Sequence, residues 1–396
     1  MNKLKVGRLK VRRRCPDWRS RVEGLKVEGL RLFGSILFFI LLGGCTAVTS
    51  TPTTVVPLTE TPLPETATPT LIASPLETAR PVSTATMTVT PLPTSENIPI
   101  IQFPAPGLIH DLRWEPNGKQ LAIAVGTEIH LYDAHLGEDR VIQLGIWTER
   151  LAFDPSNTLF GAALKDGSIH IWDWGSVSQD EVCKFTAHSK GANSLSFQQG
   201  GNLLATTGTD IISKIWDISL TTDGCKVKTV GQLIGSSFTA PDVSFSADGQ
   251  KFALVDIKDI YLRESQTRKL ITVLHGDLAI FDIAFSPDGR WLAAAQNNNS
   301  VTLWDLNTSP KPTSTLLQLP ASSVKSYTWR VDFSAHDTLL AAATSDGAML
   351  VWQLADLRPV FSRSLGHPIA GLAFNPATSA LTVGTLDGSV YMYAIK

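Results

Sequence analysis

Residue types that could carry catalysis are spread through the 396 residues without forming a known catalytic pattern. There is no Gly-x-Ser-x-Gly nucleophile elbow, no His-Glu-x-x-His zinc motif, no phosphate-binding glycine loop and no Cys-x-x-Cys pair. The eight histidines are scattered, and two of them, His130 and His170, fall at the same alternating position of predicted strands. We therefore expect no catalytic residue, no metal, no cofactor and no enzymatic activity.

Cys45 is the one cysteine whose surroundings point to chemistry. A basic segment ends at Arg31 and is followed by 11 uncharged residues, Leu32–Leu42, too few for a membrane-spanning helix of roughly 20 residues but typical of an export signal. Leu42-Gly43-Gly44-Cys45 resembles the bacterial lipobox. That resemblance implies a signal peptide at 1–44 that is cut before Cys45, whose thiol is then attached to lipid. An uncleaved signal anchor is the alternative.

The segment that follows, 46–97, differs sharply in composition. It holds 16 Thr and 9 Pro and no aromatic residue, so it cannot bury enough apolar surface to fold. Extended at roughly 3.1 Å per residue, it would reach about 160 Å. We expect residues 45–97 to be a lipidated cysteine and a disordered Thr/Pro-rich linker, which holds the remaining domain away from a membrane.

Seven similar units follow residue 97. Each begins with an aliphatic residue two positions before an aromatic anchor, the period of a β-strand, and the residue between them is small in five of the seven. A turn signal, a second strand, a polar turn and a third strand follow, and the residue that closes the third strand lies 18 or 19 positions after the anchor. The anchors are Trp114, Phe153, Phe197, Phe245, Phe285, Phe333 and Phe374.

These units, over 98–396, resemble the WD40 repeat family. Trp-Asp pairs close three third strands, at Trp172-Asp173, Trp216-Asp217 and Trp304-Asp305. The resemblance implies an all-β, seven-bladed β-propeller with four strands per blade. It also implies a structural hydrogen-bond network of His188, Thr206, Asp210 and Trp216. Because the outermost strand of each blade would follow the Trp-Asp pair, the last blade lacks one, and we expect 98–103 to pair there as the closing strand.

Cys183 and Cys225 fall in the predicted outer strands of blades two and three. An extracytoplasmic location would permit a disulfide, but outer strands of adjacent blades diverge and a bridge needs Cα atoms within about 7 Å. We expect these two cysteines to remain unbridged.

Charge and rim residues indicate the kind of partner. Residues 1–44 hold 11 Lys and Arg against 3 Asp and Glu, whereas 45–396 hold 23 against 33, an acidic body that argues against nucleic-acid binding. Residues shortly before each anchor should rim one entrance of the channel, and aromatic rings and arginine are common in binding hot spots. The predicted rim consists of Trp147, Arg150, Phe281, Asp282, Tyr327, Trp329 and Arg330, with Asp111 and Asp242 beside it.

Together these observations predict a lipid-anchored, extracytoplasmic bacterial protein that is a monomer. Its propeller would bind a protein or peptide as a non-enzymatic scaffold, and its N-terminal lipid would bind the membrane. The alternative is a propeller that binds a glycan or small ligand in its central channel.

Overall fold

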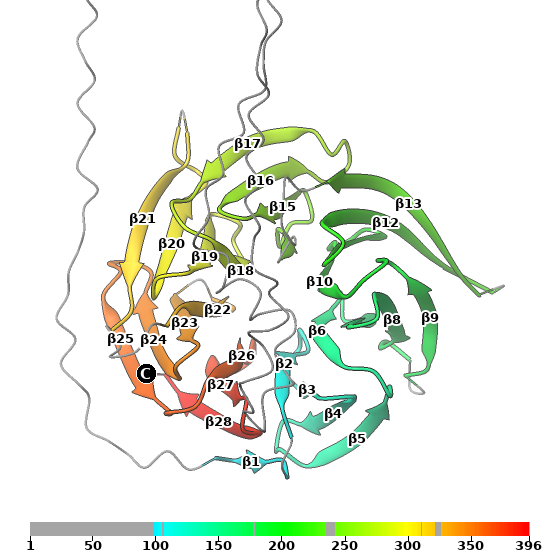
Figure 1. The fold of residues 1–396 in the computed structure, drawn as a ribbon, viewed down its shortest axis with the longest axis horizontal. Coiled ribbons are helices and arrows are strands. Elements are labelled where there is room, and N and C mark those ends of the chain that lie inside the picture. The colour runs from blue at the N-terminus through cyan, green and yellow to red at the C-terminus, as the bar shows by residue number, and fades with distance from the viewer. Residues whose placement is uncertain are drawn as a thin grey trace, which may run out of the picture. The chain divides into compact units, whose positions relative to one another are not determined.

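The computed structural model describes residues 99–104, 107–176, 179–222, 224–234, 242–309, 311–320, 326–336 and 338–395. Every regular element in these ranges is a β-strand, and the strands form seven four-stranded antiparallel sheets. Figure 1 shows the sheets arranged around a central axis in chain order. The predicted seven-bladed propeller is therefore confirmed. The predicted signal peptide, Cys45 and the linker to residue 97 lie outside the described residues, within which no helix is long and apolar enough to cross a membrane.

In the first four blades, the first strand is innermost and the fourth is outermost (Figure 1). Blade one contains β2 (Ile109–Trp114), β3 (Gln120–Val125), β4 (Glu128–Asp133) and β5 (Glu138–Gln143). Blade two contains β6 (Thr148–Phe153), β7 (Leu159–Leu164), β8 (Ser168–Asp173) and β9 (Glu181–Thr186). Blade three contains β10 (Ala192–Phe197), β11 (Leu203–Gly208), β12 (Ile212–Thr221) and β13 (Gly224–Ile234). Blade four contains β14 (Val243–Phe245), β15 (Lys251–Asp256), β16 (Asp259–Glu264) and β17 (Leu270–His275).

The remaining blades repeat this order until the chain ends. Blade five contains β18 (Ile280–Phe285), β19 (Trp291–Gln296), β20 (Ser300–Asp305) and β21 (Thr313–Gln318). Blade six contains β22 (Thr328–Phe333), β23 (Leu339–Thr344), β24 (Ala348–Gln353) and β25 (Pro359–Ser364). Blade seven contains β26 (Ile369–Phe374), β27 (Ala380–Thr385), β28 (Ser389–Ala394) and the N-terminal β1 (Ile101–Gln102).

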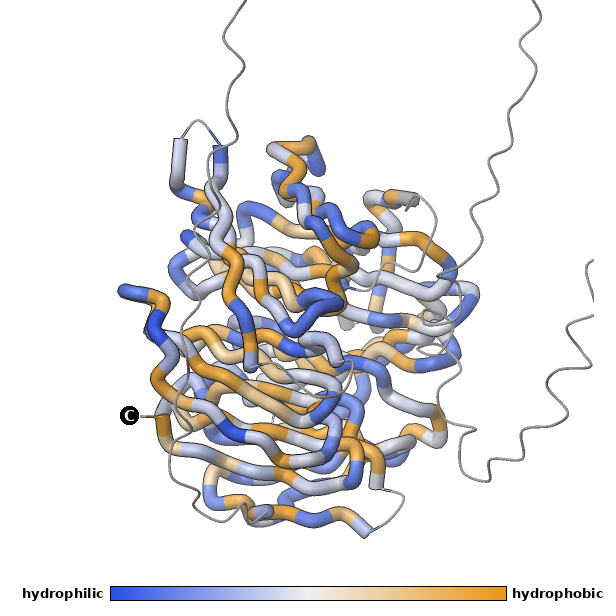
Figure 2. Tube along the Cα trace, turned by 60° about the vertical axis from the view of Figure 1, so that its left-hand side comes forward, coloured by the Kyte–Doolittle hydropathy of each residue, from blue (hydrophilic) through white to orange (hydrophobic). Residues whose placement is uncertain are grey.

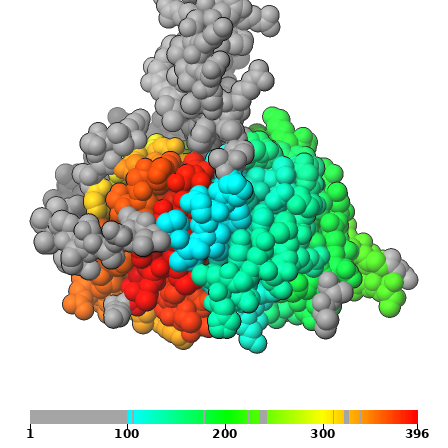
Figure 3. All heavy atoms as spheres, turned by 90° about the horizontal axis from the view of Figure 1, so that it is seen from below, coloured from blue at the N-terminus to red at the C-terminus, as the bar shows by residue number. Residues whose placement is uncertain are grey.

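The ring is closed by part of the predicted segment 98–103: β1 spans Ile101–Gln102, and residue 98 lies outside the described residues. β1 pairs antiparallel with β28, with Ile101 opposite Val390, and the backbone N–H groups of Ile100 and Phe103 donate to blade seven on either side of this pair. Figure 3 shows the first described residues, in cyan, beside the red last blade. Phe103 is buried against the rings of His130 and Tyr132 in blade one. The closing strand therefore joins the last blade to the first.

Apolar layers between neighbouring blades form the core. Each hydrophobic cluster takes residues from two adjacent sheets, as where Ala293 and Leu303 of blade five pack with Val331 and Trp352 of blade six. Figure 2 shows apolar stretches recurring along the stacked strands. The predicted turn after the anchor is present too: Gly118 has a positive φ of 72°, and a Cβ there would lie 2.7 Å from the Cβ of Ala377 in blade seven. Only glycine fits that seam.

The expectation that Cys183 and Cys225 stay apart is wrong. The two form a disulfide with Cα atoms 5.4 Å apart. The reason is the length of the β12–β13 hairpin, whose strands have 10 and 11 residues where most others have 6. Figure 1 shows this hairpin extending past the ring, and Cys225 near its tip packs against the same hydrophobic cluster as Val182 and Phe185 of β9. Outer strands diverge in general, but this one reaches over the neighbouring blade.

Removing the bridge should destabilise the propeller. A Cys183→Ala/Cys225→Ala variant frees a 42-residue separation, for which the chain-entropy account of cross-links gives a loss of about 4 kcal/mol in the free energy of unfolding. Urea unfolding of both proteins, with and without reductant, measures this loss. Reductant should lower the stability of the wild type and leave that of the variant unchanged. Equal stability of the two proteins without reductant would contradict the bridge.

Candidate functional site

The innermost strands place polar side chains at the seams between blades. Asp111, Asp242, Asp282 and Asp332 each accept a hydrogen bond from a backbone N–H of the next blade's innermost strand, and Ser196 does the same with its hydroxyl. The donors are Leu151 at 2.9 Å, Ile283 at 2.8 Å, Val331 at 2.9 Å, Phe374 at 2.7 Å and, for Ser196, Phe245 at 3.0 Å. These contacts satisfy buried amides outside the sheet ladders and lock one blade to the next.

Arg150 crosses the channel between these carboxylates. Its Nη2 lies 2.7 Å from Oδ1 of Asp282 and 3.2 Å from Oδ1 of Asp242, so one guanidinium of blade two bridges blades four and five. All three side chains are at most 5% exposed. Ser194 adds a hydroxyl that donates to Oδ1 of Asp242 at 2.6 Å. The channel thus holds a buried charge network, in which Nη1 of Arg150 and Oδ1 of Asp111 have no hydrogen-bond partner among the described residues.

Two carboxylates share this one guanidinium, and their pKa values separate accordingly. Burial raises the pKa of Asp242 from 3.8 to about 6, against the pull of Arg150 and with the charge of Asp282 adding to the rise. Burial also opposes ionisation of Asp282, but Arg150, Arg330 and Arg113 outweigh it and hold the pKa of Asp282 below its usual value. Asp282 is therefore the ionised partner of Arg150, and Asp242 is the group that takes up a proton first.

Arg330 is also part of the interior. Its Nε donates to the carbonyl of Ala370 at 2.8 Å, and its Nη2 donates to the carbonyl of His110 at 3.3 Å. Burial and the nearby charge of Arg150 lower the pKa of Arg330 to about 10. Of the seven predicted rim residues, Arg150, Asp282 and Arg330 are thus buried structural groups, as are Asp111 and Asp242. They offer little surface to a partner.

Three predicted aromatic residues do come together at an entrance of the channel. The ring centroids of Phe281 and Tyr327 are 5.1 Å apart, and those of Tyr327 and Trp329 are 5.5 Å apart. Phe281 and Trp329 sit at β-bulges, where the register shifts between their neighbours in β18 and β22, and all three side chains are half-buried. A bulge re-aims a side chain out of the ladder. We call Phe281, Tyr327 and Trp329 the aromatic ledge.

Trp147, the fourth predicted aromatic rim residue, lies outside the ledge. Its ring makes an edge contact with His110 at 4.8 Å, and the Nζ of Lys165 lies 5.9 Å from its centre. Burial, with the charges of Lys165 and Arg330, lowers the pKa of His110 to about 4, so His110 is neutral beside Trp147. The predicted rim is therefore divided into a three-ring ledge, a separate Trp147 site and buried charges.

The four residues predicted to form a structural network are joined by hydrogen bonds in blade three. Nε1 of Trp216 donates to the hydroxyl of Thr206, which pairs with Nε2 of His188, and Nδ1 of His188 pairs with Asp210, each contact being 2.9 Å long. Burial lowers the pKa of His188 below its usual value. With a neutral ring the donors run in one direction, from Trp216 through Thr206 and His188 to Asp210.

Two members of the channel, Arg113 and Asp332, were not among the predicted rim residues. Nε of Arg113 lies 3.3 Å from Asp111, and Asp332 binds the Phe374 amide. Both stand between the aliphatic residue and the anchor, the position that is small in the other five units. Two charges among five small residues were the available signal. Within the described residues, no three His, Cys, Asp or Glu side chains are grouped to hold a metal ion.

Comparison with known proteins agrees with this architecture. Residues 126–173, 179–217 and 268–305 match the family described as WD domain, G-beta repeat. The Protein LST8 homolog of Drosophila melanogaster is 29% identical over 248 residues, covering 60% of this chain and 77% of that protein. Nuclear distribution protein PAC1 of Arthroderma benhamiae is 27% identical over 171 residues, covering 40% and 36%. WD repeat-containing protein 1 of Rattus norvegicus is 28% identical over 155 residues, covering 36% and 23%.

The buried charge network makes a prediction about pH. Since the pKa of Asp242 is raised by folding, its contribution to stability is full below about pH 4 and is lost as the pH rises through about 6. Between pH 4 and pH 7, the free energy of unfolding of an Asp242→Asn variant should therefore rise relative to that of the wild type by on the order of 1–3 kcal/mol. Urea unfolding across this range measures the difference, and a difference independent of pH would contradict the assignment.

The matched control is Asp282→Asn, in which the sign is reversed. The pKa of Asp282 is lowered by folding, so its contribution is present at neutral pH and is lost on acidification below about 4. Neutralising Asp282 should destabilise the protein at pH 7 by about 3–5 kcal/mol, because it removes the charge of the carboxylate that lies closer to the buried guanidinium of Arg150. The same urea series measures it.

Proposed function

We propose that this chain, a WD40-repeat β-propeller, is a non-enzymatic scaffold for a protein or peptide partner. The observation that carries the proposal is the aromatic ledge. Three adjacent half-buried rings of Phe281, Tyr327 and Trp329 stand at an entrance of the channel, where large aromatic side chains are typical binding hot spots. In the channel, Arg150 is paired with Asp242 and Asp282.

We further propose that the propeller is displayed outside the cytoplasm on a lipid anchor at Cys45. Two independent features support this proposal. The export signal and lipobox-like residues precede a Thr/Pro-rich linker. The Cys183–Cys225 disulfide is typical of a protein in an oxidising compartment. The domain arrangement would be a signal at 1–44, a lipidated linker at 45–97 and a monomeric propeller from residue 98, held away from the membrane.

A ligand in the central channel is the weaker alternative. Arg150 bridges Asp242 and Asp282 there, so a ligand that displaced this bridge would have to break a buried pair of charges, which is costly. The ledge needs no such rearrangement. We therefore favour the entrance over the channel as the place where a partner binds.

The ledge is tested by removing two of its rings. We expect an envelope protein that is retained by the detergent-solubilised full chain to be lost, by at least about tenfold, from a Phe281→Ala/Trp329→Ala variant, since hot-spot aromatics contribute about 2 kcal/mol or more each. Quantitative mass spectrometry of the retained proteins measures the change. Circular dichroism establishes that the variant is folded.

A Phe361→Ala/Tyr393→Ala variant is the matched control. These two half-buried rings also pack together, with centroids 5.2 Å apart, but on strands β25 and β28 away from the ledge. Retention of the partner should be unchanged. Equal retention by the wild type and the ledge variant would contradict the ledge as the binding surface.

The anchor is tested by Cys45→Ser. Without a thiol at this position no lipid can be attached, so the protein should leave the membrane fraction, and the diacylglyceryl mass on the mature N-terminal peptide should be absent. Fractionation and intact-mass spectrometry measure the two effects. A Cys15→Ser variant, altered within the predicted signal, should remain membrane-bound. A Cys45→Ser protein that stays in the membrane fraction would refute the anchor.

A further inference from the structure

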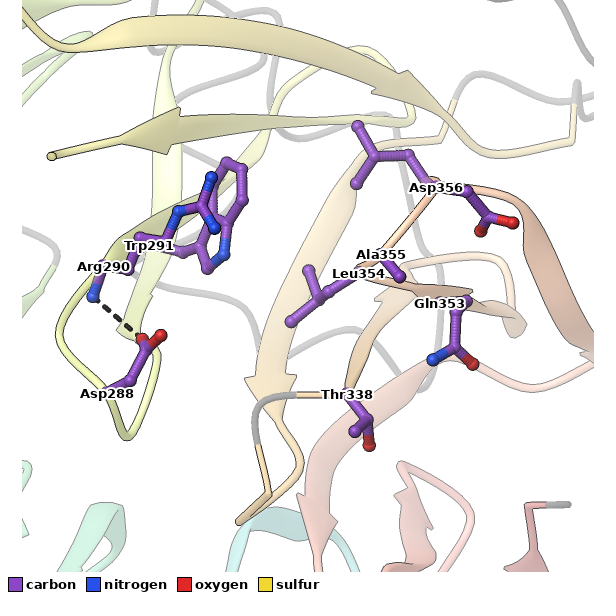
Figure 4. Close-up of a pocket in the computed structure, with 9 residues that line it drawn as sticks. Asp288, Arg290, Trp291, Thr338, Gln353, Leu354, Ala355 and Asp356 are labelled. Atoms are coloured by element: carbon purple, nitrogen blue, oxygen red, sulfur yellow. Dashed lines mark hydrogen bonds between the residues drawn. The ribbon is translucent and has the colours of Figure 1, made fainter. Parts of the chain in front are cut away.

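A groove separates blades five and six at the ends of the strands away from the ledge. Its volume is about 510 Å³, within the usual range for small-ligand sites. One wall comes from the β18–β19 turn and the start of β19, and the other from the end of β24 and the turn before β25. Figure 4 shows Trp291 and Arg290 on one side and Leu354, Gln353 and Thr338 on the other.

The corresponding seam between blades one and two is filled. There Trp174, two residues after the closing Trp172, packs on Phe153 and Phe160, and its Nε1 donates to Glu115 of blade one at 3.0 Å. In blade six the residue two after the closing Trp352 is Leu354, which is much smaller than tryptophan. Blade five has Ser286 where blade one has Glu115, and that hydroxyl donates within its own turn to Asp288 at 2.5 Å. Neither bridging group is present at the groove.

One wall of the groove is a flat stack of a charged and an aromatic side chain, and the other is aliphatic. The guanidinium of Arg290 stacks over the ring of Trp291 at 4.5 Å and is held there by Oδ2 of Asp305, which accepts from Nε at 3.1 Å and from Nη2 at 2.7 Å. The opposite side is formed by Leu354 and Leu357, which pack in the same cluster as Trp291. A flat stacked wall facing an aliphatic wall suits a ligand with a flat apolar face.

Polar side chains surround this apolar slot. It is lined by Gln353, Thr338, Asp288 and Asp356. Among the described residues, the side-chain amide of Gln353 has no hydrogen-bond partner. These side chains supply donors and acceptors around the Arg290–Trp291 stack and the two leucines. A pyranose ring has the matching pattern, because its hydroxyl groups project around the ring and its C–H groups form the faces.

The backbone of the groove is not available to a ligand. The N–H groups of Gln353, Leu354 and Leu357 already donate to the carbonyls of Arg358, Thr338 and Gln353, at 2.8–2.9 Å. β19 and β24 are interior strands, each with a neighbour on both sides. An extended peptide that binds by adding a strand therefore finds no free edge here. Recognition must therefore use side chains, which excludes strand addition as the mode of binding.

The charges of the groove exclude one class of saccharide. In and beside the groove are three carboxylates, of Asp288, Asp305 and Asp356, and two guanidinium groups. Arg290 is paired with Asp305, and Arg358 is paired with Asp356. The remaining charge is negative. An anionic sugar, such as a uronate or a sulfated glycan, would meet an unfavourable potential, whereas a neutral sugar would not.

We infer that the groove between blades five and six is a binding site for a neutral saccharide. The juxtaposition that supports this inference is the Arg290–Trp291 stack facing Leu354 and Leu357, surrounded by side-chain donors and acceptors. The site is separate from the ledge: Phe281 lies near the start of β18, whereas Asp288 and Arg290 of the groove lie in the turn that follows the end of this strand. Its failure would leave the scaffold proposal untouched.

Filling the groove tests the inference. In the full chain, Leu354→Trp copies the residue that closes the seam between blades one and two, and we expect it to abolish binding without loss of fold. Titration calorimetry with chitotetraose and maltotetraose, at concentrations up to the millimolar range, provides the readout. The wild type should bind at least one of them saturably, and Leu354→Trp and Trp291→Ala should weaken that binding by about tenfold or more, equivalent to about 1.4 kcal/mol.

Leu306→Trp is the matched control, since Leu306 holds the equivalent position in blade five and is half-buried. It should bind as the wild type does. Saturable binding of neither neutral oligosaccharide by the wild type would overturn the inference, as would binding that Leu354→Trp leaves intact. Tighter binding of a sulfated oligosaccharide, or loss of a bound peptide rather than a sugar in Leu354→Trp, would overturn the neutral-saccharide assignment. Unchanged retention at the ledge in Leu354→Trp would show that the two sites are independent.

Discussion

The hydrogen bond from a backbone amide of one blade to an aspartate of the previous blade is the interaction on which the propeller depends. A sheet satisfies its own backbone along the ladders, but a ring of separate sheets needs contacts that cross the seams. Asp111, Asp242, Asp282 and Asp332 supply them, since each carboxylate accepts from the next innermost strand. Blade two carries Arg150 in place of such an acceptor, and it is this blade that the disulfide joins to blade three.

Gathering carboxylates at the centre of the ring has an electrostatic consequence. Several buried negative charges cannot share a narrow channel without counter-charges, and Arg113, Arg150 and Arg330 provide them. Arg150 reaches across the axis to blades four and five. The channel that a propeller could use for a ligand is thus committed to holding the blades together. The binding surfaces that we propose, the ledge and the groove, lie at the entrance and between blades.

Two further features join neighbouring blades. At the ring closure, β1 covers β28 and Phe103 packs onto blade one. At blade three, the long β12–β13 hairpin folds over the neighbouring blade and is fastened by Cys183 and Cys225. Both devices join sheets that the inner hydrogen bonds alone do not connect. They also bring segments far apart in the chain together through a few specific residues.

The sequence by itself determined the number of blades and the first three strands of each, and its resemblance to a known repeat family implied the outermost strands, the closing strand and the Trp216–Thr206–His188–Asp210 network. These are local patterns: a fixed spacing from anchor to closing residue and a short strand left over before the first unit. Arg113 and Asp332 were not predicted, although they are charged residues at a position that is small in the other five units. What only the tertiary structure decided was which side chains meet across the ring. Arg150 and Asp282 are 132 positions apart, and no local pattern distinguishes a buried pair from two exposed rim charges. The disulfide and the open groove likewise depend on how far one hairpin reaches and how two turns face each other, because such distances are set by packing between blades.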